Sequence, residues 1–402
     1  MIERLQISNL RNLTQVNLQS TACNVIIGEN GSGKTSLLEA IFLLSRGKSF
    51  RHHQPKRYIQ HHKKSAVVHA KINDSNALAI QKQTDATTLL RLNQTTVYNQ
   101  SILTEQLPTL LIDPSTMDML EQGSASRRQL LDWLVFHMKQ GFHSQWVAYQ
   151  RLLKQRNSLL KSTRRLTQVQ LNEIKAWDKG LGSHAALIHH YREQIFTEWQ
   201  PYFSDSVAQL LPDYAAQLSL SYNAGYDTSV ALDVQLNERL EQDLQLGYTR
   251  IGNHRADIHV HWHSNDSIDK GHDNTPSVLH TDASSKLPVL KEQAANVLSR
   301  GEKKLLITAL RLSQLPLLLR TGQHTDFPRN GMGSEATPVV LLDDITAELD
   351  GRAIEILLSS LAQLPCQVFM TSLTDEIVPL VKKLWSDSTV FHVKQGQIIS
   401  DR

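Results

Sequence analysis

The segment Gly28–Thr35, GENGSGKT, restricts the possible folds of this chain more than any other. It matches GxxxxGK[ST], a phosphate-binding loop that connects a buried strand to a helix. The apolar run Val25–Ile27 fits the end of such a strand, and an apolar-periodic helix follows Thr35. A glycine turn that merely precedes a lysine would not have these flanking elements. We therefore expect a nucleotide-binding α/β core.

The residue types of this loop suit phosphate chemistry. Glycines permit positive φ and a close approach of backbone N–H groups to phosphate oxygens, and the helix N-terminus favours an anion. Lys34 is expected to reach the β- and γ-phosphates of ATP, and the Thr35 hydroxyl to bind Mg²⁺. The predicted loop contacts are Gly28, Glu29, Asn30, Gly31, Ser32, Gly33, Lys34 and Thr35.

A second part of the site is predicted near the C-terminus, in PVVLLDDITAELD. Val339–Leu342 resembles a buried strand, and Asp343 and Asp344 follow it. In a Walker B arrangement Asp343 binds Mg²⁺, directly or through water, and Asp344 acts as general base or positions water. Without the loop, a strand ending in two exposed acids would be an equal interpretation. The candidate catalytic residues are therefore Asp344, Asp343 and Lys34.

The segment LSRGE, Leu298–Glu302, precedes an apolar-periodic helix ahead of the Walker B strand. Ser299 is expected to cap that helix. The segment is also a loose match to the ABC signature motif, whose serine approaches the γ-phosphate of ATP held by another subunit. On that interpretation Ser299 and Gly301 join the nucleotide-binding residues.

Composition sets the broad class of the protein. The chain has 402 residues, 40% hydrophobic and 20% charged, as expected for a soluble globular protein of two or more domains. Its apolar runs are too short to span a bilayer, and its N-terminus does not resemble a signal peptide. Cys23 and Cys366 are the only cysteines, which indicates a reducing compartment and ordinary thiols.

Two segments carry cations without acidic residues. Residues 40–73 contain eight Lys or Arg side chains, and residues 151–172 contain six, among them Arg156. Solvated surfaces are the ordinary explanation, whereas a surface that follows nucleic-acid phosphates requires independent support.

The predicted secondary structure changes along the chain. Short strand patterns fill the first part, and a mainly helical pattern extends over residues 127–211, with helices too short and irregular for a long coiled coil. Polar insertions are expected at 264–287 and 321–337. His259, His261 and His263 alternate, so they would share one face of a strand; a polar face is favoured over a zinc site.

The phosphate-binding loop (Walker A) lies near the N-terminus and the Walker B strand near the C-terminus. In this arrangement the chain resembles the ABC-type ATPases of the SMC family. That resemblance implies an α/β fold in which both chain ends assemble one ATPase head, with mixed sheets around the phosphate-binding loop. We expect residues 1–125 to form the N-terminal half of the head, 126–240 a mainly helical inserted domain, and 241–402 the C-terminal half.

Further motifs narrow the resemblance to the RecF family: NLRNL, GKSFR, DWLVFH, LKQRNSLLK, NHRADI and EQGSASRRQLLD. The resemblance adds Arg11 and Asn12, in the first motif, to the nucleotide-binding residues. It implies a cytoplasmic protein of DNA replication, gap repair and the SOS response, with ATP and Mg²⁺ as cofactors. It also implies an ATP-dependent homodimer with weak DNA-dependent ATPase activity, which binds single-stranded, double-stranded and gapped DNA and works with RecO and RecR but not with membranes.

Two other functions remain open. A transporter ATPase usually has a switch histidine after the strand that follows Walker B, where this chain has Thr371. A structural DNA clamp that binds ATP without useful hydrolysis is compatible with Asp344, where many relatives have glutamate. Stimulation of ATPase activity by DNA separates the first alternative, and single-turnover hydrolysis the second.

Overall fold

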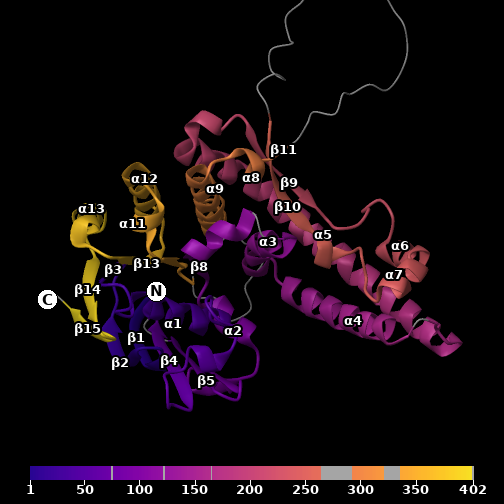
Figure 1. The fold of residues 1–402 in the computed structure, drawn as a ribbon, viewed down its shortest axis with the longest axis horizontal. Helices are drawn as coiled ribbons and strands as arrows, with labels where there is room; N and C mark the ends of the chain where they lie inside the picture. Colours follow the sequence, from indigo (N-terminus) through magenta and orange to yellow (C-terminus); the bar gives the residue numbers. More distant parts are fainter. Residues whose placement is uncertain (74–75, 121–122, 164, 264–291, 321–335, 401–402) are drawn as a thin grey trace, which may run out of the picture. The chain divides into compact units, whose positions relative to one another are not determined.

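The computed structural model describes residues 1–73, 76–120, 123–163, 165–263, 292–320 and 336–400. The chain forms two compact units (Figure 1). The head unit contains Met1–Met117 and Leu319–Arg402, and the helical unit contains Asp118–Leu318. The predicted polar insertion 264–287 lies outside the described residues, as does 321–337 apart from its last two positions.

These units do not follow the predicted division at residues 125 and 240. Of residues 241–318, which we assigned to the head, the described ranges 241–263 and 292–318 pack within the helical unit. There β10 (Asp257–Trp262) pairs with β9 (Leu218–Asn223), and α9 (Arg300–Leu312) packs on α5 (Gln168–Leu210). Pairing between segments distant in sequence sets the division, and composition does not reveal it.

One sheet of the head unit is antiparallel, in the order β2-β1-β4-β5-β6-β7. In β1, near-alternation buries Ile2, Leu5, Ile7 and Leu10 on the core side. This confirms the predicted strands of the first part of the chain. The strands are β1 (Ile2–Leu10), β2 (Leu13–Gln19), β4 (Ser65–Ile72), β5 (Asn76–Gln83), β6 (Thr88–Leu92) and β7 (Thr95–Val97).

The second sheet joins strands from both ends of the chain, in the order β15-β14-β3-β13-β12-β8. All neighbours are parallel except β15. Its strands β3 and β12 are buried along their whole length, as their continuous apolar runs predict for a parallel sheet. The strands are β3 (Cys23–Ile27), β8 (Thr109–Ile112), β12 (Val339–Leu342), β13 (Gln367–Ser372), β14 (Ser388–Lys394) and β15 (Gln397–Ser400).

The α/β head is thus assembled from both chain ends, as predicted. Helix α1 (Lys34–Arg46) packs against strands of both sheets and shares one apolar core with them. The buried Gln367 amide also ties the ends together: it accepts from Ile2 N at 2.8 Å and donates to the carbonyls of Ile2 and Thr21, each at 2.8 Å. The other helices here are α2 (Gln100–Gln106), α11 (Ile345–Glu348), α12 (Gly351–Ala362) and α13 (Val378–Leu384).

In the helical unit, α4 (Phe142–Ser162) packs along α5. The prediction of short helices is wrong for α5, which has 43 residues and continues through Pro201. A three-stranded sheet, β11-β10-β9, completes the unit. Its other elements are α3 (Ser124–Met138), α6 (Leu232–Glu238), α7 (Leu240–Leu246), α8 (Ala294–Val297) and β11 (Glu292–Gln293), with α10 (Gln314–Arg320) at the boundary.

Candidate nucleotide site

The phosphate-binding loop lies between β3 and α1, as predicted. A Cβ at Gly28 would collide with the carbonyl oxygen of Val393 in β14, so the loop can pass β14 only with glycine at this position. Gly33 has φ +121°, a conformation that other residues rarely adopt, and it opens α1. The N-terminus of α1 therefore faces the loop with free N–H groups.

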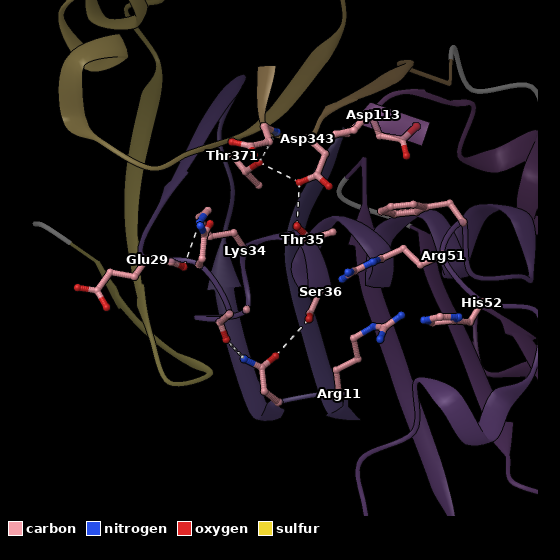
Figure 2. Close-up of a pocket in the computed structure, with 17 residues that line it drawn as sticks. Arg11, Glu29, Lys34, Thr35, Ser36, Arg51, His52, Asp113, Asp343 and Thr371 are labelled. Atoms are coloured by element: carbon pink, nitrogen blue, oxygen red, sulfur yellow. Dashed lines mark hydrogen bonds between the residues drawn. The ribbon is translucent and has the colours of Figure 1, made fainter. Parts of the chain in front are cut away.

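The Lys34 side chain is folded into the loop (Figure 2). Its Nζ donates to the carbonyl of Gly28 at 2.6 Å and to that of Glu29 at 3.1 Å. Burial lowers the pKa of Lys34, and the nearby carboxylates of Asp344 and Asp343 oppose this. The ammonium thus occupies the interior of the loop, where it can exchange carbonyl partners for phosphate oxygens.

Asp343 connects the two halves of the head unit. Its Oδ1 accepts from the Thr35 hydroxyl at 3.0 Å and from the Thr371 hydroxyl at 2.9 Å. Thr371 Oγ1 in turn accepts from Asp344 N at 2.8 Å. Thr35 and Asp343, predicted as Mg²⁺ ligands, therefore lie together, and hydroxyl and carboxylate oxygens are the donors that Mg²⁺ prefers.

The electrostatic environment of Asp343 suits a cation. Burial raises the pKa of Asp343, the Thr371 and Thr35 hydroxyls lower it, and the carboxylates of Asp113 and Asp344 raise it further. Within the described residues, Asp344 Oδ1 is buried and has no hydrogen-bond partner. Asp344 also has φ +55°, which is unusual for a residue with a side chain. A metal ion with its water shell would satisfy this group of acids.

Asp113 was missed from the sequence. It is buried directly after β8, whose Ile112 pairs with Leu342 of β12, so Asp113 and Asp343 follow neighbouring strands. The signal was an acid at the end of a predicted strand, but the order of strands was unknown. Thr371 was noted only as the residue in place of a switch histidine, without the bonds it makes.

The β1–β2 turn forms another side of the pocket. Asn12 Nδ2 donates to the Gly31 carbonyl at 3.0 Å, and Asn12 Oδ1 accepts from the Ser36 hydroxyl at 3.2 Å. Arg11, with φ +49°, lines the pocket and forms an ion pair with buried Glu39. Both residues predicted in this turn therefore touch the loop or the helix that follows it.

The resulting cavity has a volume of about 780 Å³. In Figure 2, Arg11, Arg51 and His52 gather on one side of it, whereas Asp343 lies beside Thr371 and Asp113 lies beyond Asp343. Sequence reasoning gave Arg51 and His52 no role here. Of the predicted residues, those that line the cavity are Arg11, Asn12, Glu29, Asn30, Gly31, Gly33, Lys34, Thr35, Asp343 and Asp344. Gly28 and Ser32 belong to the loop but do not line the cavity.

Ser299 and Gly301 belong to the helical unit and do not line this cavity. Ser299 caps α9 as predicted: Glu302 N donates to Ser299 Oγ at 3.4 Å, and Ser299 N donates to Glu302 Oε2 at 2.7 Å. The Tyr214 hydroxyl also donates to Glu302, at 2.7 Å. This cap holds the N-terminus of α9 in a defined conformation.

The two basic stretches differ. Between Lys48 and Lys64 the Lys and Arg side chains are exposed, and we call this range the cationic segment. In the second stretch, Arg156 is fully buried and binds Asp178 and Asp243, each at 2.7 Å. The inclusion of Arg156 in a phosphate-binding surface is therefore wrong.

The alternating histidines have local partners. His261 and His263 bond to Ser221 and Ser219, at 2.6 and 2.7 Å, and His259 lies 3.5 Å from Asp257. In the described ranges no three His, Cys, Asp or Glu side chains are arranged to hold a metal ion. Nor does any described helix have the length and hydropathy needed to cross a bilayer.

Known proteins resemble the chain over nearly its whole length. Residues 1–398 match the family model for the RecF/RecN/SMC N terminal domain. The DNA replication and repair protein RecF of Acinetobacter baumannii (strain SDF) is 38% identical over 402 residues, covering 99% of this chain and 98% of the relative. RecF of Coxiella burnetii (strain Dugway 5J108-111) is 32% identical with the same coverage.

Solved structures show the same fold. The recombination mediator protein RecF-ATP in the RecFOR pathway superposes with a TM-score of 0.77 at 21% identity, covering 100% of this chain and 97% of the other. An Smc head bound to the C-winged helix domain of ScpA gives 0.51 at 13% identity, covering 100% and 97%. Together with the family match and the identity to curated relatives, this shows that the chain belongs to the RecF family.

Proposed function

We propose that this chain is an ATP-dependent DNA-binding protein of DNA replication and recombinational gap repair. It binds single-stranded, double-stranded and gapped DNA, helps load recombinase with RecO and RecR type mediators, supports the SOS response, and acts in the cytoplasm. Family membership supports this proposal, since the relatives are called DNA replication and repair protein RecF and one solved relative is called a recombination mediator of the RecFOR pathway.

The bond between Thr35 and Asp343 carries the nucleotide assignment. These residues lie 308 positions apart, yet they bring a loop hydroxyl and a strand-end carboxylate within 3.0 Å, beside Lys34. Lys34 and the loop N–H groups bind the phosphates, and Thr35 and Asp343 hold Mg²⁺. When bound, Mg²⁺ neutralises phosphate charge during phosphoryl transfer.

We assign to Asp344 the role of orienting the attacking water and accepting its proton. Its Oδ1 is buried without a partner, while its backbone is fixed through Thr371. The aspartate side chain is shorter than that of glutamate, so slow hydrolysis is the expected activity, with the DNA dependence that membership of the RecF family implies. This slow turnover distinguishes the proposal from a clamp that only binds ATP.

ATP also drives a homodimer. Lys34, Thr35 and Asp343 bind the phosphates and metal, and the capped N-terminus of α9 supplies Ser299 and Gly301 from the other subunit. A helix N-terminus carries partial positive charge and N–H donors suited to a γ-phosphate. ADP cannot make this bridging contact, so the dimer depends on the γ-phosphate.

The cationic segment is the proposed DNA surface of the head unit. Its exposed Lys and Arg side chains are suited to DNA phosphates, and such binding weakens with salt. A transporter ATPase has no use for this surface. Thr371 also bonds to Asp343 and Asp344 at the position of the switch histidine in transporters.

Lys34→Ala tests the nucleotide assignment. Loss of the charged hydrogen bonds to phosphate should weaken ATP binding by about 100-fold in a calorimetric titration. Lys383→Ala, which removes an exposed lysine of the same unit, is the matched control and should bind ATP like the parent. Unchanged ATP affinity in Lys34→Ala would exclude the assignment, and equal DNA affinity with and without ATP would exclude ATP-dependent DNA binding.

A further inference from the structure

Glu39 is a fully buried carboxylate on α1, one helical turn beyond Thr35. It does not line the nucleotide cavity. Its Oε1 accepts from Arg11 Nη2 at 2.9 Å and also from the Ser49 hydroxyl, and its Oε2 accepts from Arg11 Nε. One carboxylate therefore binds two side chains that come from different segments of the head unit.

Both of these partners control a wall of the cavity. Arg11 itself lines it, held in a left-handed backbone conformation and by a bond from its N–H to the Tyr58 carbonyl at 2.7 Å. Ser49 is buried, and its Oγ accepts from the N–H groups of Arg51 and His52, each at 3.0 Å. The Ser49 hydroxyl thus fixes the turn that brings Arg51 and His52 to the cavity.

We propose that Glu39 is a positioning residue of the nucleotide pocket, which sets Arg11 on one side and the Arg51–His52 turn on the other. The ligand class is a nucleoside triphosphate, because the cationic and donor groups on these walls suit an anionic ligand. The inference rests on the proposed ATP binding and assigns a function to a residue that does not touch the ligand.

A purely structural role accounts less well for this arrangement. A buried ion pair adds little net stability, because desolvation offsets the attraction between the charges. The buried positions on either side of Glu39 in α1, Leu38 and Ala40, are apolar and pack in the core. The charge of Glu39 instead serves the cavity. Its bidentate contact with the Arg11 guanidinium and its contact with the Ser49 hydroxyl both restrict groups at the cavity wall.

The test compares Glu39→Gln with Asp132→Asn in the full-length protein. Both variants replace a carboxylate that binds an arginine, and Asp132 lies in the helical unit against buried Arg192. Both should lower Tm. Only Glu39→Gln should raise the Kd for ATP, by about tenfold, as for other residues that orient the groups in contact with a ligand. Binding is measured at a temperature well below either Tm.

A milder variant protects the test against misfolding. Ser49→Ala removes one hydroxyl and leaves the ion pair, so the Kd for ATP should rise by about threefold. Because Ser49 and Glu39 bond to each other and hold the same wall, the effects of the two substitutions on the Kd for ATP should combine to less than their product in the double variant. If Glu39→Gln is insoluble, an unchanged Kd for Ser49→Ala overturns the proposal.

Lys34→Ala, measured in parallel, separates the two levels of inference. If Lys34→Ala loses ATP but Glu39→Gln binds it like the parent, Glu39 serves the fold alone and only this proposal fails. If Lys34→Ala retains ATP, the proposed nucleotide site itself fails. A selective loss of affinity in Glu39→Gln, with Asp132→Asn unaffected, supports the positioning role.

Discussion

Charged side chains are buried in both units, but they are arranged differently. In the helical unit, Arg192 is fully buried and binds Asp132 at 2.8 Å and the Asn253 carbonyl at 2.9 Å. Burial alone would lower the pKa of Arg192, but Asp132 reverses this and the pKa is raised. In the head unit, Asp343 lies near Asp344 and Asp113, and the pKa of Asp343 is raised.

This comparison distinguishes charged side chains that stabilise the fold, such as Arg192 and Asp132, from those that require a ligand, such as the acids near Asp343. Arg192 and Asp132 satisfy each other, so removing either should damage the structure. The acids near Asp343 repel one another in the nucleotide-free protein, and a bound cation would relieve this repulsion. Like charges gathered in a cavity are thus a better indication of function than a buried ion pair.

The largest expected effect is on hydrolysis. Asp344→Asn should bind ATP but hydrolyse it about 10²–10⁴-fold more slowly, because the amide cannot accept a proton from water. Single-turnover hydrolysis measures the rate, and light scattering should show an ATP-bound dimer accumulating. Asp343→Asn should also lose Mg²⁺-dependent hydrolysis. Parental rates in Asp344→Asn would remove the general-base role.

The next largest effect is a loss of stability in the helical unit. Asp132→Ala leaves the Arg192 guanidinium buried without its carboxylate, which should lower the free energy of unfolding by about 3–5 kcal/mol. Urea denaturation of this variant and the parent measures the change. ATP affinity at low temperature should be retained. If ATP binding fell while stability did not, the contrast between the two units would be wrong.

A smaller effect is expected on dimer assembly when Ser299, a proposed γ-phosphate contact in the helical unit, is changed. Ser299→Arg places a bulky side chain at the capped N-terminus of α9, so the variant should bind ATP as a monomer. Its ATP-driven dimer should weaken by at least about tenfold, the equivalent of a single charge-assisted hydrogen bond. Sedimentation with ATP, with ADP and without nucleotide provides the measurement. An equally strong dimer in all three conditions would refute the mechanism.

Local patterns predicted much of this fold. The loop Gly28–Thr35, the buried strand before Asp343 and the cap at Ser299 each depend on neighbours within a few residues. Asp113 could not be assigned, because its place beside Asp343 depends on which strands are adjacent. The division into units could not be predicted for the same reason, since β10 pairs with a distant strand.

Other errors came from signals that were present but not used. Arg156 was counted as a surface cation, yet Tyr149, Leu153, Arg156 and Leu160 have helical spacing and form one buried face of α4. Periodicity therefore indicated burial where charge alone suggested exposure. The error in the length of α5 had another cause. Proline normally ends a helix, but packing overrides this tendency at Pro201, which lies inside α5.

The smallest expected effect is a gain in stability at the nucleotide site. The folded-state pKa of Asp343 is raised above its ordinary value of 3.8, so protonation stabilises the nucleotide-free protein, and this stabilisation is lost as pH rises through the raised pKa. Asp343→Asn keeps an oxygen that accepts from Thr35 and Thr371 but removes the charge. At pH 7 its Tm should exceed that of the parent by about 2 °C, and the difference should vanish near pH 4. With Mg²⁺ and ATP the order should reverse, because ligand binding stabilises only the parent. Asp375→Asn, which alters an exposed acid of the same unit, is the control for general charge effects. A lower Tm for Asp343→Asn at every pH would show that Asp343 supports the fold like the buried pair of the helical unit.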